Sequence, residues 1–384
     1  MSLTFEHTTL GQRVLFGAGQ VAEHLAAEVA RLGAERVMVI SSASEARTAD
    51  EVTGRIAVTV HHRDVAPHVP VDKAKAACDI ATDRDIDVLV SVGGGSTTGL
   101  AKAIAMVTGI PIIAVPTTYS GSEATNVWGL TEQARKTTGI DGKVLPVTVI
   151  YDATLTLSLP VDLSVASGMN GLAHCIDAMW GPRADPINRA LAGEGIRALA
   201  AGLPAVNADP LGMPGREQVL YGAYLAGVAF ASAGSGLHHK ICHVLGGAYD
   251  LPHAQTHTIV LPHVLAFNAP AVPDLDARIA AAFGSDSAVA GLGALQAELH
   301  APTALKDYGL TEKDIPEAVE LILPVIPPSN PRPVTADDLR TLLHAAYSGA
   351  RPADTVDPTG TAPGNGNGNG NGNGAHPHPR KANR

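Results

Sequence analysis

The first 150 residues alternate between short runs rich in valine and isoleucine and longer alanine-rich stretches. The apolar runs cover Val37–Ile40 and residues 88–92, 112–115 and 147–150. Such runs suit strands that are buried on both faces of a sheet. The stretches between them, such as Val21–Leu32 and residues 73–81, have the spacing of helices. This regular alternation predicts a mostly parallel sheet with helices packed on its faces.

After Leu159 the composition shifts to alanine, leucine and glycine, and valine and isoleucine runs become rare. Residues 187–201, 217–231 and 279–283 are predicted to be helical, and the prolines at 204, 210 and 214 predict a loop between the first two. From Arg351 the chain becomes rich in proline, then in an Asn-Gly repeat that cannot build a core. We predict an α/β dinucleotide-binding domain over 1–159, an all-helical catalytic domain over 160–350 and a disordered tail over 351–384.

The charge balance and the cysteines narrow the class of protein. A net charge of -10 argues against a nucleic-acid or membrane-surface binder, which would need a basic face. The 3 cysteines are odd in number and far apart, which favours reduced thiols over disulfides. The N-terminal sequence MSLTFEHTTL lacks the basic and apolar regions of a signal peptide, and no run is long enough to span a bilayer. We expect a cytoplasmic protein with neither membrane nor nucleic-acid partners.

Two glycine-rich segments each follow a predicted strand and precede a predicted helix. The first, Gly17-Ala18-Gly19-Gln20-Val21-Ala22, matches the G-x-G-x-x-A pattern of dinucleotide-binding turns. The acidic residue expected about twenty positions later is missing, because Ser41 and Ser42 end the next strand. The first segment therefore favours a tight turn over a phosphate site.

The second segment, Gly93-Gly94-Gly95-Ser96, is better placed. Glycines lack the Cβ atoms that block the approach of a phosphate, and a helix N-terminus offers free N–H groups and a favourable dipole. A second polar loop, residues 116–123, follows the next predicted strand. Two such loops at neighbouring strand ends form the crevice where open α/β sheets bind nucleotides. The alternative for the second segment is a plain turn.

Six of the 16 histidines lie between His238 and His263. Three pairs of polar residues have the helical spacing of four, which puts each pair on one face: Asn170 and His174, His239 and His243, and His253 and His257. A lone histidine is more often a core residue, but this clustering favours a functional site. Residues 239–243 imitate the zinc-protease pattern H-E-x-x-H, yet Lys240 replaces the glutamate base, which excludes that class.

These motifs together resemble the iron-containing alcohol dehydrogenase superfamily over about residues 5–345. The segments that carry the resemblance are VSVGGGSTTGLAKAIA, PTTYSGSEAT, VIYDATLTLSLP, SGMNGLAHCIDA and HHKICHVLGGAYDLPHAQTHTIVLPH. PTTYSGSE is one residue shorter than the alcohol dehydrogenase form PTTAGTGSE and is followed by WGLTE and RKTTG, which looks like the maleylacetate reductases. The resemblance implies the architecture shared with dehydroquinate synthase, a nucleotide-binding α/β domain and an all-helical domain with the active site between them.

The resemblance also implies a cofactor site. Gly94, Gly95 and Ser96 would hold the pyrophosphate. The adenosine and nicotinamide-ribose path would be lined by Thr117, Thr118, Lys136 and Leu157. Ser42 stands where NAD-selective relatives carry an aspartate. Without that carboxylate a 2′-phosphate is not repelled, so we expect NADH as the cofactor with NADPH tolerated.

A metal site is the point where this chain departs from the resemblance. In metal-dependent relatives an aspartate and three histidines bind the ion, and here those positions hold Asn170, His174, His243 and His253. Asparagine removes the only anionic ligand and with it most of the attraction for a divalent cation. We therefore expect no metal.

The resemblance implies reduction of maleylacetate to 3-oxoadipate with NAD(P)H, in the degradation of aromatic compounds and by a homodimer. Hydride would add to the far carbon of a double bond conjugated to a ketone, which gives an enolate. We expect His243 and His253 to stabilise the ketone oxygen and to deliver the proton. Four further side chains would help to bind the two carboxylates of the substrate: His174, His239, Lys240 and His257. Tyr119 is also expected to reach the substrate.

Three alternatives stay open at this point. A metal-dependent alcohol or polyol dehydrogenase of the same superfamily would use Asn170 as a neutral ligand. A lyase of the dehydroquinate synthase kind would need the metal and would show no net NADH consumption. An inactive binding protein is disfavoured by the intact nucleotide loops.

Overall fold

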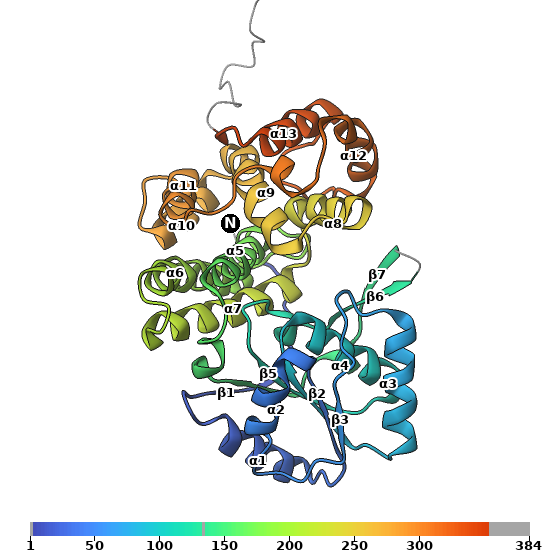
Figure 1. The fold of residues 1–384 in the computed structure, drawn as a ribbon. Coiled ribbons are helices and arrows are strands. Elements are labelled where there is room, and N and C mark those ends of the chain that lie inside the picture. The colour runs from blue at the N-terminus through green and yellow to red at the C-terminus, as the bar shows by residue number, and fades with distance from the viewer. Residues whose placement is uncertain (1–2, 133–134, 353–384) are drawn as a thin grey trace, which may run out of the picture.

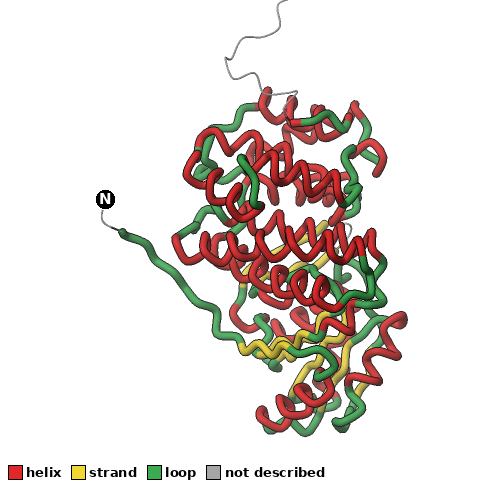
Figure 2. The backbone as a smooth tube through the Cα atoms, turned by 90° about the vertical axis from the view of Figure 1, so that its left-hand side faces the viewer, coloured by secondary structure: helices red, strands yellow, loops and turns green. Residues whose placement is uncertain are grey.

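The computed structural model of the chain describes residues 3–132 and 135–352. The predicted tail lies outside these residues from position 353 onward, so its disorder stays a prediction. A sheet with flanking helices forms the N-terminal part, and layers of helices form the C-terminal part (Figure 1). In Figure 2 the yellow strands lie below the red helical layers, and the segment before the first strand runs out from the body as a loop.

Six parallel strands form the main sheet, in the order β1-β8-β5-β4-β2-β3. Their bounds are β1 (Arg13–Phe16), β2 (Val37–Ile40), β3 (Val60–His62), β4 (Val88–Gly93), β5 (Ile112–Pro116) and β8 (Thr148–Tyr151). Every residue of β2, β4, β5 and β8 is buried, because helices or neighbouring loops cover both faces. These four strands are the four apolar runs of the sequence, and the predicted fold class is confirmed.

Alternate residues of the strands pack against different helices. Val37 and Val39 pack with α1 (Val21–Leu32) and α2 (Ala46–Val52). Met38 and Ile40 pack with α3 (Val71–Asp83) and α4 (Gly95–Thr108) on the opposite face. The connection from β2 to β3 therefore runs on one face, whereas the connection from β4 to β5 runs on the other. The strand order reverses between β2 and β4, which is where open α/β sheets bind ligands.

A two-stranded antiparallel hairpin, β6 (Val127–Glu132) with β7 (Arg135–Ile140), is inserted between β5 and β8. It lies outside the main sheet and projects beside α4 and α8 in Figure 1. The sequence analysis did not predict this hairpin.

The C-terminal part contains nine α-helices among the described residues: α5 (Val161–Ala178), α6 (Pro186–Ala208), α7 (Met213–Ala233), α8 (Leu237–Tyr249), α9 (His253–Asn268), α10 (Pro273–Phe283), α11 (Ala288–Glu298), α12 (Ile315–Ile322) and α13 (Ala336–Ser348). The core of α5, α6 and α7 is contiguous with Val149 and Tyr151 of β8, so the helices rest directly on the sheet-bearing part. The predicted loop was too long at its start, because Pro204 lies inside α6.

Short 3₁₀ helices join several of these elements. They are η1 (Ala43–Glu45), η2 (Ser122–Ala124), η3 (Gly142–Val144), η4 (Ala153–Thr156), η5 (Ala269–Ala271), η6 (Leu305–Tyr308), η7 (Glu312–Asp314) and η8 (Leu323–Val325). No single helix in the described ranges is long and apolar enough to cross a membrane. The helices α7 and α8 reach that length and apolarity only as a pair, and they are bent by 98°.

Candidate active site

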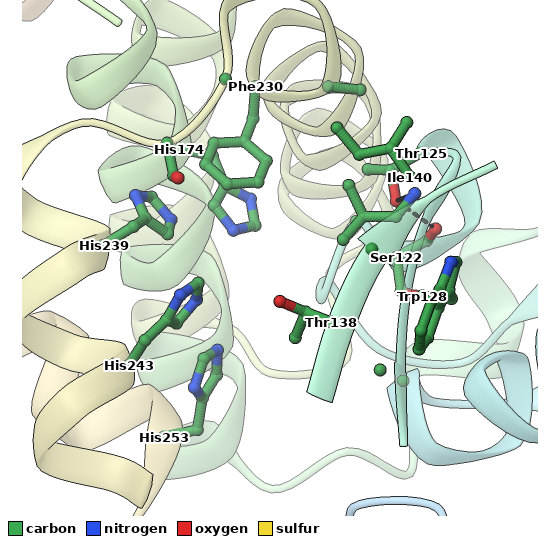
Figure 3. Close-up of a pocket in the computed structure, with 18 of the residues that line it drawn as sticks. Ser122, Thr125, Trp128, Thr138, Ile140, His174, Phe230, His239, His243 and His253 are labelled. Atoms are coloured by element: carbon green, nitrogen blue, oxygen red, sulfur yellow. Dashed lines mark hydrogen bonds between the residues drawn. The ribbon is translucent and has the colours of Figure 1, made fainter. Parts of the chain in front are cut away.

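A cavity of about 920 Å³ lies between the carboxyl edge of the sheet and the helices. Figure 3 shows Thr138, Ile140 and Trp128 of the hairpin on one side and the histidines of the helices on the other. The first turn of α4 reaches the same cavity through Gly95 and Ser96. Both parts of the chain therefore build this site.

Two helices and the start of a third carry the polar side chains that line the helical wall. These side chains are Asn170 and His174 of α5, His239, Lys240 and His243 of α8, and His253 at the start of α9. The predicted spacing of four residues does place Asn170 beside His174 and His239 beside His243 on shared helix faces. Of the predicted substrate residues, the structure thus brings these six together.

A buried carboxylate fixes the orientation of His239. Asp177 Oδ2 accepts hydrogen bonds from His239 Nδ1 at 2.7 Å and from the backbone N–H of Gly236 at 2.7 Å. A Cβ atom on Gly236 would overlap Asp177 Oδ1, so the approach of the α7–α8 turn to α5 requires a glycine. With Nδ1 donating, His239 Nε2 keeps its lone pair, and among the described residues this nitrogen has no hydrogen-bond partner.

Burial keeps the imidazoles of His174 and His239 neutral. Desolvation, with a smaller contribution from the neighbouring His253, lowers the pKa of His174 to about 3. Desolvation also holds the pKa of His239 well below its usual range, with a further contribution from His174. His174 stacks between Phe230 and His239, with ring centroids 4.7 and 5.0 Å away. Neutral imidazoles offer lone pairs and N–H donors, but not fixed positive charge.

Two predicted substrate residues do not line the cavity. Tyr119 is fully buried, and its hydroxyl accepts a hydrogen bond of 3.0 Å from Arg216 Nη1, so its contact with the substrate stays a prediction that this position does not support. His257 is also fully buried and lies behind His253, with its Nδ1 2.9 Å from His238 Nε2. Tyr119 follows β5 in sequence, but the buried guanidinium draws its hydroxyl into the core.

The predicted phosphate loop begins α4 at the carboxyl end of β4. Gly94 is the residue before the helix and Gly95 is its first residue. Gly93 has a φ of 149°, and a Cβ atom there would lie 2.6 Å from Thr97 Oγ1, so this turn requires glycine. The side chain of Thr118 lies against Gly94. Free N–H groups at this helix N-terminus can receive an anion.

The remaining predicted cofactor residues lie on four different segments of the N-terminal part. Thr117 directly follows β5, whereas Ser42 follows β2 and pairs its hydroxyl with Ser44 at 2.9 Å. Leu157 ends η4 and is not among the cavity-lining residues. Lys136 pairs with Thr131 in the hairpin, and its side chain lies outside the described part of the chain.

The first glycine segment forms the turn between β1 and α1. Gly19 adopts a φ of 71°, and β1 is an edge strand, so this turn lies away from the reversal of strand order between β2 and β4. The preference for a tight turn agrees with this position.

The helical wall carries side chains of the kinds that bind a divalent ion. Asn170 Oδ1 is buried without a partner in the described ranges, as is His239 Nε2. The imidazoles of His174 and His253 line the same wall. A set of one amide oxygen and three neutral imidazoles suits an iron- or zinc-type ion, because such ligands must be deprotonated to bind. The set includes His239, which sequence analysis had assigned to the substrate.

Comparisons with known proteins agree along the chain. Residues 11–153 match the family model described as iron-containing alcohol dehydrogenase, and residues 164–347 match the C-terminal model of the Fe-containing alcohol dehydrogenase family. A maleylacetate reductase of Sphingobium indicum is 43% identical over 91% of this chain and 99% of its own length.

Solved structures give the same result. An iron-containing alcohol dehydrogenase from Corynebacterium glutamicum has a TM-score of 0.92 and 59% identity, and covers 93% of this chain and 100% of its own. A maleylacetate reductase from Agrobacterium tumefaciens has a TM-score of 0.87 and 41% identity, with 91% and 100% covered. These matches overturn the expectation of no metal, because both family models describe iron-containing enzymes. The loss of the anionic ligand at Asn170 was too narrow a ground for that expectation.

Proposed function

Because the chain belongs to the maleylacetate reductases of the iron-containing alcohol dehydrogenase family, we propose that its cavity reduces the carbon–carbon double bond of maleylacetate with hydride from NAD(P)H. The chain is an NAD(P)H-dependent oxidoreductase. The observation that carries the proposal is a cavity in which a glycine-rich helix N-terminus and a wall of imidazoles meet.

The cofactor binds along the carboxyl edge of the sheet. Gly94, Gly95 and Ser96 receive the pyrophosphate at the N-terminus of α4, where N–H groups and the helix dipole attract an anion. Thr117 and Thr118 flank this loop from the end of β5, with Thr118 against Gly94. The hairpin and the helical wall would hold the nicotinamide between them, and the bound cofactor would supply the hydride.

The substrate lies against the helical wall. Lys240 supplies a positive charge for a carboxylate, which a protein with a net charge of -10 must provide locally. Hydride adds to the carbon farther from the ketone, and negative charge develops on the ketone oxygen. His243 lines the wall where a proton is delivered to the enolate carbon. A dry, preorganised site strengthens every one of these interactions.

The family implies an iron-type ion, and the wall provides ligands for it. Asn170, His174, His239 and His253 would hold it, and a bound ion supplies Lewis-acid polarisation of the ketone oxygen. Asp177 orients His239 from behind, in the manner of carboxylates that support metal-binding histidines. Three of these side chains, Asn170, His174 and His239, are buried, whereas His253 is exposed.

We also propose the setting in which the enzyme works. All three cysteines are buried and unpaired, which supports a reducing cytoplasm. The resemblance to the family supports a homodimer. The domain boundaries proposed are residues 1–159 for the cofactor and 160–350 for the helical part, and the substrate is a small dicarboxylate without nucleic-acid or membrane partners.

The proposal is tested by following NADH absorbance with maleylacetate as the substrate and identifying the product. Stoichiometric loss of NADH with formation of 3-oxoadipate, in which the ketone is retained, is the expected result. Formation of a hydroxy acid by reduction of the ketone would instead assign the chain to the alcohol dehydrogenase activity of the superfamily. No NADH loss with the metal-loaded enzyme would refute both.

A further inference from the structure

The carboxyl edge of the sheet contains an acidic residue that the sequence analysis did not consider. β4 lies between β2 and β5, and the chain leaving β2 departs to the other side from the chain leaving β4. This reversal makes the space above the ends of β2 and β4 the ligand crevice of the sheet. A residue that follows β2 and a residue that follows β5 can meet only across the end of β4.

Glu45 and Thr117 make that contact. Glu45 ends η1, just after β2, and its Oε1 accepts a hydrogen bond of 2.8 Å from Thr117 Oγ1. The bond therefore passes over the turn of Gly93 and Gly94, where the pyrophosphate binds in the proposed function. Glu45 Oε2 is buried and has no hydrogen-bond partner in the described ranges. A carboxylate that can still accept a hydrogen bond thus lies at the crevice.

Ser42, where an aspartate was expected and not found, does not enter this contact. The Ser42 hydroxyl instead pairs with the hydroxyl of Ser44, the residue directly before Glu45. The acidic group that ends the second strand in NAD-binding folds hydrogen-bonds the ribose and repels a 2′-phosphate. Glu45 brings the same chemical group to the same edge of the sheet from three residues farther along the chain.

We propose that Glu45 is a specificity-determining residue of the cofactor site, whose carboxylate disfavours the 2′-phosphate of NADPH and so selects NADH. This inference rests on the proposed NAD(P)H-dependent function and reverses the tolerance of NADPH that Ser42 alone implied. The carboxylate acts through its charge, which reaches a phosphate several ångströms away in a partly buried crevice. Holding Thr117 is a separate role, which an uncharged acceptor could fill equally well.

Glu45→Gln separates the two roles, because the amide keeps an acceptor for Thr117 and removes the charge. Dissociation constants for NADH and NADPH are measured by fluorescence titration on the metal-loaded protein without any substrate. We expect the ratio of NADPH to NADH affinity to rise at least tenfold in Glu45→Gln. Adding Ser42→Asp to that variant returns a carboxylate to the crevice and is expected to restore the preference for NADH.

The matched control is Glu51→Gln, which removes the same charge from an exposed position of α2, six residues farther along the chain. It is expected to leave the ratio unchanged. An unchanged ratio in Glu45→Gln, or an equal fall in both affinities, would overturn the proposal and leave Glu45 as a brace for Thr117. Wild-type protein that binds neither cofactor would contradict the proposed function itself, which distinguishes the two failures.

Discussion

The chemistry of the cavity depends on how individual side chains are held. Asp177 fixes His239 through one ring nitrogen and leaves the other for the cavity. Asn170 contributes a buried amide oxygen in the same wall. The spacing of four residues identified His174, His239, His243 and His253 as candidate site residues. This spacing can be read from the sequence because helix periodicity depends only on neighbouring residues. Asp177 could not be assigned from sequence, because its contact with His239 forms only when α8 folds back onto α5. The burial of the Tyr119 hydroxyl could not be predicted for the same reason, because its hydrogen-bond donor Arg216 comes from a helix that is distant in sequence.

Asn170→Asp tests the metal wall at this scale. A carboxylate restores the anionic ligand, so we expect the dissociation constant for Fe²⁺ or Zn²⁺ to fall at least tenfold. Equilibrium dialysis of the chelator-treated protein measures it. Asn207→Asp, on α6, adds the same charge outside the cavity and is expected to leave ion binding as in the wild type. Equal constants in wild type and Asn170→Asp would show that this residue does not face the ion.

His243→Ala tests the delivery of the proton. General acid catalysis contributes roughly 10²–10⁴-fold, so we expect kcat to fall by about 100-fold or more, with a much smaller rise in the KM for NADH. Steady-state kinetics with varied NADH separates the two constants. His344→Ala, on α13 and away from the cavity, serves as the control and is expected to keep wild-type kinetics. Equal kcat in the His243 variant would remove it from the catalytic set.

At the scale of elements, the sheet was predictable and its insertion was not. The four buried strands carry uninterrupted apolar runs, a signal that depends on each strand alone. β6 is half-buried along most of its length, so its sequence alone does not show that the hairpin lines the cavity. Pro204 inside α6 likewise shows that tertiary packing outweighs a local helix breaker. Lys102 of α4 holds the loop before the hairpin in place through hydrogen bonds to its backbone.

Lys102→Met tests that role. Lys102 Nζ donates to the carbonyl oxygens of Ser122, Thr125 and Val127 at 2.6 to 2.8 Å. Methionine fills the same space but leaves three buried acceptors without a donor, at about 1–3 kcal/mol each. We expect the free energy of unfolding to fall by about 3 kcal/mol or more, measured by urea titration. The exposed Lys143→Met should change it by less than about 0.5 kcal/mol. Equal stabilities for the two variants would contradict the bracing role.

His263 of α9 gives a pH dependence with a defined sign. Burial lowers its pKa from 6.5 to about 4. The unfolded chain therefore binds a proton between these values while the folded chain does not, so stability falls as pH falls from about 6.5 to 4 and is unaffected above 6.5. The loss reaches about 3 kcal/mol at pH 4. His263→Gln is expected to remove this share of the acid sensitivity, seen as a smaller drop in unfolding free energy between pH 7 and 5. An identical drop in the variant would exclude His263.

At the scale of the whole molecule, the cavity exists because helices of the C-terminal part rest on the carboxyl edge of the sheet. In the proposed function the crevice between β2 and β4 would receive the cofactor, and the helical wall would receive the substrate and the ion. The fold class and this division could be predicted, since both follow from the change in composition after Leu159. The boundary at 159 and 160 stays a prediction. The need for a metal could not be predicted from one substituted ligand, because three neutral histidines remain beside it.

The position at which hydride arrives tests the central claim most directly. The metal-loaded enzyme is supplied with NADH carrying deuterium at the transferred position, and the product of maleylacetate reduction is examined by NMR. The account predicts 3-oxoadipate with one deuterium on the methylene carbon that lies two bonds from the ketone and next to a carboxylate. Deuterium on a carbon that bears a hydroxyl group would contradict it, because the ketone and not the double bond would then have been reduced.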